Sequence, residues 1–513
     1  MTKAIDIINK IVVFCLFAAS LVVLAVSSVT TIYYDMHSDV DRPVYGKENI
    51  PLLVISLIIV FGVFLMLYKR KLFESYRVFT IAGLVFVCAY CLMLILAIHP
   101  QAVNDSKTLD NIINSFMEED YSSLTEPGGY LFTWPFQLGY VLFGQWMHAL
   151  FGASNYFAWD MVQLLSVLVT VGLIYAITGE IFGDRTICGI VGFLSMGALF
   201  FYNYVTYIYG DILSMAPQTL ALYMMILFVK REKIRYAVIS ALSIAFAIMI
   251  KTNCEITLIA LVAVLIGSSF FCKATGKEMF QRLLVRLGLA TVFLLAAFAV
   301  GKAVDSYYCK LTGLPEIPAG NPAFAHIAMG LQESELEDGW FNGYNYHVFA
   351  DNGYDTQATK AAALENIKET LSDFAKRPLH GARFFVRKFT SQWADPVCVS
   401  THNLDLVSRH VENQPPLCDF IVFGRGSHIL AWIMNVFMSV CYIGVSICLF
   451  NFLVKRTATL PQMLLLILIF GGLIFHEFWE GSSRYIMRYY IYYLPYGAFG
   501  IKSLLERVGK WIH

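Results

Sequence analysis

The sequence has few charged residues. Charged side chains make up 14% of its 513 residues, whereas hydrophobic side chains make up 58%. A soluble domain has about 25% charged residues. The composition therefore excludes a protein built mainly of soluble domains and indicates a polytopic membrane protein. Lys and Arg together equal Asp and Glu in number, 37 of each, so there is no basic excess for binding nucleic acid.

The sequence also lacks a recognisable signal-peptide cleavage site and an internal repeat. The first hydrophobic run, Ile11–Tyr33, is too long for a signal peptide and lacks a small-residue cleavage site, so it is predicted to stay as a membrane anchor. The chain also shows no internal repeat. Transporters often consist of repeated halves with charges near the membrane midplane, and this absence weighs against a transporter or flippase of lipid-linked glycans, which is the alternative hypothesis.

Long apolar runs dominate what is present. A membrane helix needs about 20 apolar residues, and its backbone groups must bond within the segment. The predicted spans number about twelve: Ile11–Tyr33, Pro51–Tyr68, Phe79–Ile98, Phe157–Ile177, Thr186–Tyr204, Ile212–Val229, Tyr236–Ile250, Thr257–Cys272, Leu287–Val304, Ile429–Val454, Leu460–Phe475 and Ile491–Leu505.

The basic residues predict the orientation, because Lys and Arg favour the cytoplasmic side. With the N-terminus inside, clusters such as Lys69–Lys71 and Lys230–Arg235 fall on inner loops. This places both termini in the cytoplasm and two polar loops outside, Asn104–Gly139 and Val304–Phe423. If the apolar segment Pro135–Phe151 crossed the membrane, every later loop would change sides and Lys230–Arg235 would fall outside. The segment is therefore predicted to lie in the outer membrane interface.

The large outer loop is too long for a simple connection. Its segment Thr356–Phe374 has apolar residues at helical spacing, and the loop is predicted to form a small mixed cap outside the membrane. Cys398 and Cys418 lie in it. They either form a disulfide, if the compartment is oxidising, or remain two separate thiols.

Several motifs resemble the GT-C superfamily of membrane glycosyltransferases, in particular protein-O-mannosyltransferase-like and aminoarabinose-transferase-like enzymes of glycosyltransferase family 39. An Asp follows a membrane span and precedes an aromatic amphipathic segment. Further motifs follow in the expected order at Tyr130–Gly139, Leu150–Gly152, Tyr209–Asp211, Lys251–Asn253 and Glu480–Tyr485. The sequence departs from the family's frequent Asp-Glu pair, since Ser106 follows Asp105.

The resemblance implies an all-α membrane protein of GT-C-like fold. Residues 1–78 add two N-terminal helices, 79–304 form the core with a catalytic outer loop at 99–156, 305–425 form the cap and 426–513 the last helices. It also implies transfer of a sugar from a polyprenyl-phosphate donor to a hydroxyl acceptor in the cell envelope, such as a protein, a glycolipid or a cell-wall polymer. The active site would lie outside the membrane.

Two carboxylates are the catalytic candidates. Asp105 is predicted to be the general base that takes the proton of the acceptor hydroxyl. Its alternative role is to cap a helix that begins near Ser106. Asp211 lies on an outer turn beside tyrosines, where it either contacts substrate or is an ordinary turn residue. Asp110 is interpreted as a solvated helix residue.

Two cations are predicted to bind the lipid phosphate. Lys251 ends an apolar span on the outer side, where a charge often marks a site; alternatively its stem extends to the surface. Arg484 suits a phosphate because a guanidinium forms paired hydrogen bonds; alternatively it pairs with Glu480. The resemblance adds Tyr130, Gln137 and Tyr485 as substrate-binding candidates.

No cluster of His and Asp is evident, so no tightly bound cofactor or metal is expected, and dependence on a divalent ion stays open. Asp39 and Asp41 form an Asp-x-Asp pair in the first outer loop. In soluble enzymes that use sugar nucleotides, such pairs hold a metal ion. The pair is the fallback site should Asp105 be inert.

Overall fold

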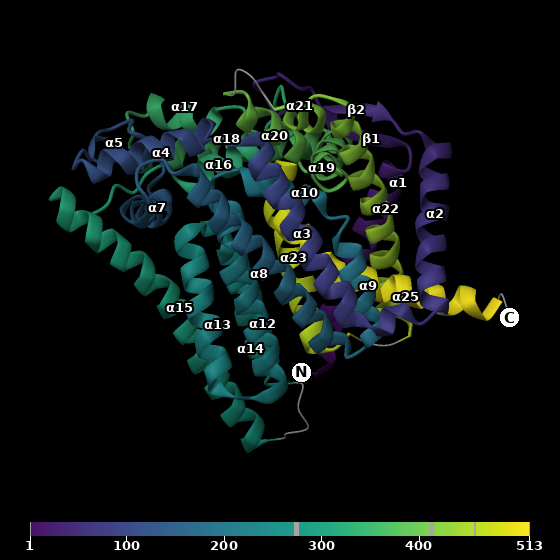
Figure 1. Ribbon diagram of the computed structural model, residues 1–513. Helices are drawn as coiled ribbons and strands as arrows, with labels where there is room; N and C mark the ends of the chain where they lie inside the picture. The colour runs from purple at the N-terminus through teal and green to yellow at the C-terminus, as the bar shows by residue number, and fades with distance from the viewer. Residues whose placement is uncertain (1, 271–275, 411–414, 456–457, 512–513) are drawn as a thin grey trace.

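Figure 1 shows a bundle of long helices with shorter elements gathered at one end. The computed structural model describes residues 2–270, 276–410, 415–455 and 458–511. The end of the predicted span Thr257–Cys272 and residues 411–414 of the large loop lie outside these ranges.

The bundle is built from helices whose sequences are mostly apolar. Backbone groups in lipid have no water to bond, so helices satisfy them within the segment. These helices are α1 (Thr2–Ser27), α2 (Ile50–Lys69), α3 (Tyr76–Ile98), α8 (Tyr156–Phe182), α9 (Arg185–Ser195), α10 (Leu199–Tyr202), α12 (Met215–Arg231), α13 (Ile234–Ile250), α14 (Glu255–Gly267), α15 (Lys277–Thr312), α22 (Arg425–Val454), α23 (Leu460–Phe478) and α25 (Leu494–Trp511).

The chain is a multi-pass membrane protein. Within the described residues, eight helices are long and apolar enough to cross a bilayer, and a ninth span exists if α9 and α10, bent by 58°, count as one. Two predicted spans correspond to shorter apolar helices, α13 and the segment Thr252–Gly267. The last predicted span, Ile491–Leu505, is not among the candidates. The count of twelve is therefore not confirmed.

Glycines allow the last helices to pack closely. A Cβ atom on Gly500 would lie 1.7 Å from the carbonyl oxygen of Gly444, and one on Gly444 would lie 2.3 Å from the oxygen of Gly497. Only residues without a side chain permit α22 and α25 to approach to this distance. Small residues serve the same purpose in other membrane helix pairs.

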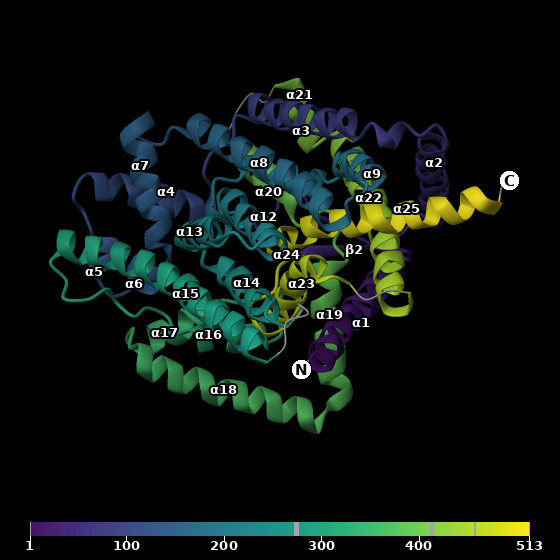
Figure 2. The same cartoon turned by 90° about the horizontal axis from the view of Figure 1, so that it is seen from below.

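The first outer loop holds the only strands in the described part of the chain. Strands β1 (Thr30–Tyr34) and β2 (Pro43–Lys47) form an antiparallel hairpin between α1 and α2. Figure 2 shows α1 and α2 on the opposite side of the bundle from α13 and α15.

The second loop predicted to lie outside contains α4 (Asn104–Met117), α5 (Ser122–Thr125), α6 (Tyr130–Thr133), η2 (Pro135–Gln137) and α7 (Leu138–Phe151). Figure 1 views α7 end-on, across the direction of the long helices. The segment is not among the candidate spans, and its position in the membrane interface stays a prediction.

The large loop forms a cap of helices over the same end of the bundle. They are α16 (Ala323–Gly330), α17 (Tyr344–Asp351), α18 (Thr356–Lys376), α19 (Pro378–Trp393), α20 (Ser400–Ser408) and α21 (Pro416–Val422). Helix α18 confirms the predicted helical segment. The cap was expected to be mixed, but its described residues form no strand; an isolated bridge pairs Trp340 with Gly481, outside the cap.

Buried polar contacts fasten the cap to the membrane part. Lys388 of α19 is fully buried and donates to the carbonyls of Gly330 and Trp479, the latter at 2.7 Å. Beside it, Gly481 N donates to the carbonyl of Gly339 at 2.8 Å, and within the cap the buried Trp340 donates to Ser391 Oγ at 3.0 Å. Cys398 and Cys418 are both buried and are not joined by a disulfide.

Figure 1 places both chain ends at one end of the bundle, away from α4, the hairpin and the cap. The polar loops thus share one side and the termini share the other. This arrangement brings the functional candidates of the two outer loops together.

Candidate active site

The candidate residues lie where helices of the bundle end or break. The turn after η3 (Asn203–Thr206) leads into α11 (Gly210–Leu213), and η4 (Thr252–Cys254) follows the end of α13. After α23 the chain enters α24 (Ser483–Tyr490), followed by η5 (Ile491–Tyr493). Helix α4 begins just beyond α3. These junctions are separated in sequence but meet at the end of the bundle that carries the cap.

Gly210 permits the closest of these approaches. A Cβ atom there would lie 2.8 Å from the carbonyl oxygen of Ile250. A side chain at this position would therefore push α11 away from the end of α13. Without one, Asp211 comes within reach of Lys251.

Asp211 and Lys251 form a buried ion pair. Lys251 Nζ lies 3.4 Å from Asp211 Oδ1, and the two side chains are 10% and 4% exposed. Lys251 Nζ also lies 4.0 Å from the centre of the Tyr209 ring, a favourable distance for a cation–π contact. The second oxygen of Asp211 is buried without a hydrogen-bond partner. The snorkelling alternative for Lys251 is therefore wrong, because its charge points inward.

Arg484 lies on the neighbouring side of the same cluster. It donates to the hydroxyls of Tyr207 at 3.1 Å and Tyr485 at 3.3 Å. Its Nε is buried and has no hydrogen-bond partner. The alternative, a pairing of Arg484 with Glu480, is wrong: Tyr485 intervenes and donates to Glu480 Oε1 at 2.9 Å, and Glu480 precedes the start of α24.

Tyrosine hydroxyls connect the cations to the second outer loop. Gln137 donates to the Tyr209 hydroxyl at 2.6 Å. Burial raises the pKa of Tyr130, and the charge of Asp105 raises it further. Burial likewise raises the pKa of Tyr207 to about 12, with Arg484 opposing and Asp105 adding to the shift. These tyrosines stay protonated at neutral pH, and the hydroxyl of Tyr207 accepts a hydrogen bond from Arg484.

Asp105 is exposed in the first turn of α4 and has no hydrogen bond or ion pair with any described residue. The helix is capped instead by Ser106, whose Oγ accepts from Val103 N at 2.9 Å and donates to Val103 O at 2.6 Å. The capping alternative for Asp105 is therefore wrong. Its charge contributes to the raised pKa of Tyr130, Tyr207 and Glu480.

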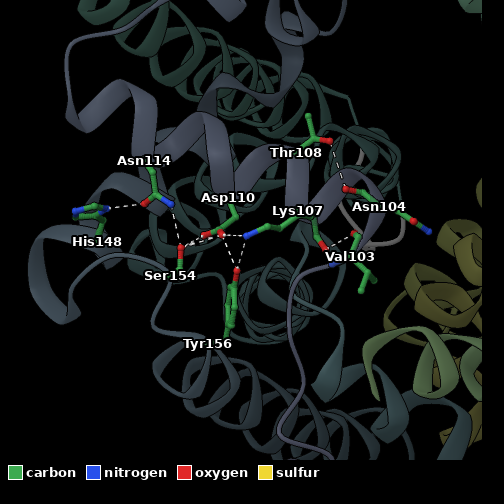
Figure 3. Close-up of polar contacts among 10 residues, drawn as sticks. Val103, Asn104, Lys107, Thr108, Asp110, Asn114, His148, Ser154 and Tyr156 are labelled. Atoms are coloured by element: carbon green, nitrogen blue, oxygen red, sulfur yellow. Dashed lines mark hydrogen bonds and ion pairs between the residues drawn. The ribbon is translucent and has the colours of Figure 1, made fainter. Parts of the chain in front are cut away.

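Asp110 is buried and joins three elements, as Figure 3 shows. Its carboxylate accepts from Tyr156 Oη at 2.7 Å, Ser154 Oγ at 2.9 Å and Lys107 Nζ at 3.2 Å. The same serine accepts from Asn114 Nδ2 at 2.9 Å. The interpretation of Asp110 as a solvated residue is wrong, because its carboxylate is buried and accepts from the half-buried hydroxyls of Ser154, in the turn before α8, and of Tyr156, the first residue of α8. This network fixes α4, and with it Asp105.

The Asp-x-Asp pair divides between two environments. Asp39 is 94% exposed and pairs with Arg409 at 2.7 Å, whereas Asp41 is half-buried. No group of three or more potential metal ligands occurs among the described residues, and only Asp39 of the pair forms an ion pair with one of them.

Arg488 belongs to the cluster although sequence reasoning selected only Arg484. It is 1% exposed and donates to Ser214 Oγ at 2.7 Å. Its Nε and Nη1 are buried without hydrogen-bond partners. Arg488 follows Arg484 by four residues and so lies on the same face of α24. This spacing could have identified Arg488 from the sequence.

Part of the chain matches the model of a known protein family. Residues 138–300 match the family model described as dolichyl-phosphate-mannose-protein mannosyltransferase. The matched segment runs from α7 into α15 and contains Asp211 and Lys251, while Asp105 and Arg484 lie outside it. The resemblance to GT-C glycosyltransferases is thereby confirmed. No curated protein matches the sequence.

The solved structures that are similar to this chain include the following two. The archaeal oligosaccharyltransferase AglB from Archaeoglobus fulgidus, in complex with an inhibitory peptide and a dolichol-phosphate, aligns with a TM-score of 0.44 and 14% identity over 84% of this chain. The chain spans about half, 51%, of the length of that protein. ArnT from Cupriavidus metallidurans in the apo state aligns with a TM-score of 0.29 and 11% identity, covering 82% of this chain and 76% of ArnT.

Proposed function

We propose that the protein transfers a sugar from a polyprenyl-phosphate donor to a hydroxyl acceptor at the outer face of the membrane. One observation carries the proposal. Three cations lie at these junctions, the buried Arg488 and the partly buried Lys251 and Arg484; Lys251 pairs with the buried carboxylate of Asp211, while the carboxylate of Asp105 at the start of α4 is unpaired. The cations suit a phosphate, and the free carboxylate suits a base.

The cations are assigned to the donor phosphate. Burying unpaired charge is costly, and a phosphate would offset the excess charge around Asp211. Arg484 Nε and two nitrogens of Arg488 still have unused donors. The proposed role of Asp211 is to hold Lys251 in place; the direct catalytic role expected from the sequence stays a prediction.

An apolar groove next to the cations suits the polyprenyl chain. It has a volume of about 690 Å³ and lies between α7, the junction of α13 and α14, and α15. Gly139, Met249 and Thr252 line it, so it begins beside Lys251. A lipid lying in this groove would present its phosphate to Lys251 and Arg484.

The reaction follows from these assignments. The acceptor oxygen attacks the anomeric carbon, and Asp105 removes its proton as the new C–O bond forms. The bond between that carbon and the phosphate oxygen breaks, and its electron pair leaves with the lipid phosphate. Lys251 and Arg484 stabilise the negative charge that develops there.

Transfer by the purified protein tests the proposal. The detergent-solubilised protein is given a polyprenyl-phosphate sugar with a labelled sugar and an alkyl glucoside as acceptor, and the product mass is measured. A product heavier than the glucoside by one sugar residue is expected. If the label stays on the lipid but crosses sealed vesicles that contain the protein, the protein is a flippase and the proposal is wrong.

A further inference from the structure

Asp395 is a buried carboxylate in the turn between α19 and α20. The residue is 1% exposed, and four hydrogen-bond donors reach its side chain from three parts of the chain. Two of them are the backbone N–H groups of Val397 and Val399, at 2.9 and 3.2 Å. Burying a charge is costly unless hydrogen bonds compensate it. The carboxylate therefore fixes the segments that supply these donors relative to one another.

The other two donors come from outside the cap. Tyr34, the last residue of β1, donates from its hydroxyl to Asp395 Oδ2 at 2.8 Å. Ser483, the first residue of α24, donates to the same oxygen at 2.5 Å, and its Oγ lies 3.2 Å from the Tyr34 hydroxyl. All three side chains are buried. The carboxylate therefore connects the hairpin of the N-terminal helices to the start of α24.

The same turn contacts the surroundings of Arg484 in a second place. Arg484 is the second residue of α24 and directly follows the contact with Asp395. Its guanidinium donates to the hydroxyl of Tyr207 at 3.1 Å. Tyr204 lies three residues before Tyr207 and donates to the carbonyl of Cys398 at 2.5 Å. The turn thus contacts both the helix that carries Arg484 and the tyrosine segment to which Arg484 donates.

The backbone of the turn is strained. Cys398 and Val399 have φ angles of 49° and 61°, in the left-handed region. Residues other than glycine are uncommon there, and a β-branched valine is an outlier. Such a conformation persists only where its surroundings fix it. Here Asp395 accepts from the N–H of Val399, and Tyr204 donates to the carbonyl of Cys398. Strain of this kind is concentrated at sites where groups are held in place for function.

We propose that Asp395 is a positioning residue that holds Arg484 for the donor phosphate, and that the N-terminal hairpin takes part through Tyr34. This inference rests on the proposed transferase function. Asp395 is not assigned a contact with the donor; it acts on the guanidinium through Ser483 and through the turn beside Tyr204. The hairpin lies outside the segment that matches the family model. The N-terminal helices would thereby contribute to donor binding in this chain.

Two substitutions test this role. Asp395→Asn keeps the side-chain shape but replaces one acceptor oxygen by a donor group, so it cannot accept from all four donors. The dissociation constant for a fluorescently labelled polyprenyl phosphate should rise about five- to fifty-fold. Tyr34→Phe removes only the hydroxyl of the hairpin, and the constant should rise about two- to ten-fold. In transfer to an alkyl glucoside at saturating donor, the acceptor KM of both variants should stay within about two-fold of the wild type.

Ser20→Ala is the matched control for the hairpin. Ser20 is buried on α1, and its hydroxyl donates to the carbonyl of Phe17 and lies 2.8 Å from the hydroxyl of Ser446 on α22. The variant therefore loses a buried hydrogen bond of the N-terminal helices that does not involve Asp395. It should lower the melting temperature and leave the affinity for the polyprenyl phosphate unchanged. If Ser20→Ala weakens binding as much as Tyr34→Phe, the hairpin acts only through overall stability and the inference is wrong.

A double-mutant cycle separates positioning from a purely structural role. If Asp395 acts through Arg484, the loss of affinity caused by Asp395→Asn should shrink to less than about two-fold in the Arg484→Met background. Losses that multiply in the double variant would overturn the inference, as would a lower melting temperature of Asp395→Asn with wild-type affinity. Should Asp395→Asn fail to fold, the same cycle with Ser483→Ala decides the question. Wild-type affinity of Arg484→Met would instead contradict the proposed donor site.

Discussion

Lys251 and Arg484 are partly buried cations that follow apolar helices, and the Nε of Arg484 has no hydrogen-bond partner. Replacing either by Met keeps the aliphatic stem but removes the charge. Loss of a charged hydrogen bond costs about 1.5–3 kcal/mol, so the affinity for a polyprenyl-phosphate donor should fall about ten- to hundred-fold. Isothermal titration or a fluorescent-donor assay measures this directly.

Lys310→Met is the matched control, because Lys310 is exposed near the end of α15. Its donor affinity should equal that of the wild type. Unchanged affinity in both Lys251→Met and Arg484→Met would remove these residues from the donor site.

The sequence identified some residues of this site but not their hydrogen-bond partners. Lys251 and Arg484 stand out in the sequence because charged residues are rare beside apolar runs. The residues that they contact could not be predicted. Tyr207 lies 277 residues from Arg484, and the bond from Tyr485 to Glu480 replaces the helical ion pair that the spacing of Glu480 and Arg484 suggested.

At the scale of elements, α4 is the helix whose placement decides where Asp105 lies. The network around Asp110 holds it against the turn before α8 (Figure 3). Asp110→Ala would remove the charged acceptor of the half-buried hydroxyls of Ser154 and Tyr156, and the loss of a hydrogen bond to a charged group costs about 1.5–3 kcal/mol. We expect a lower melting temperature and a lower kcat with little change in donor affinity.

Glu118→Ala is the control for this prediction, since Glu118 is exposed at the other end of α4. It should leave both the melting temperature and kcat unchanged. If Asp110→Ala melts earlier but keeps the wild-type kcat, the network stabilises the fold without positioning Asp105.

The sequence predicted α4, the interfacial α7 and α18 because their apolar spacing is local. It did not predict the burial of Asp110, because Ser154 and Tyr156 follow 44 and 46 residues later. The short breaks at η3, η4 and α24 were also beyond sequence reasoning. Each depends on how neighbouring helices pack, as the approach of Gly210 to Ile250 illustrates.

For the whole molecule, the orientation predicted from the basic loops is the property that can be measured most simply. The structure places the candidate site at one end of the bundle and both termini at the other. Cysteines introduced at two exposed positions, Glu118→Cys and Lys233→Cys, should label differently with an impermeant thiol reagent in intact cells. We expect labelling of Glu118→Cys alone, in a background in which accessible native cysteines are replaced. Labelling of Lys233→Cys before lysis would reverse the proposed orientation.

The central claim is that Asp105 is the base of a sugar transfer, and Asp105→Asn tests it most directly. Asn keeps the shape of Asp but cannot accept the proton. Single-turnover transfer from a bound polyprenyl-phosphate sugar should slow by about 10²–10⁴-fold, while donor affinity and melting temperature stay unchanged. Asp105→Glu should recover little, because a shift of about 1 Å can cost about 10²-fold. A wild-type rate in Asp105→Asn would contradict the account, and loss of transfer in the Asp39→Asn and Asp41→Asn double variant alone would move the base to the hairpin.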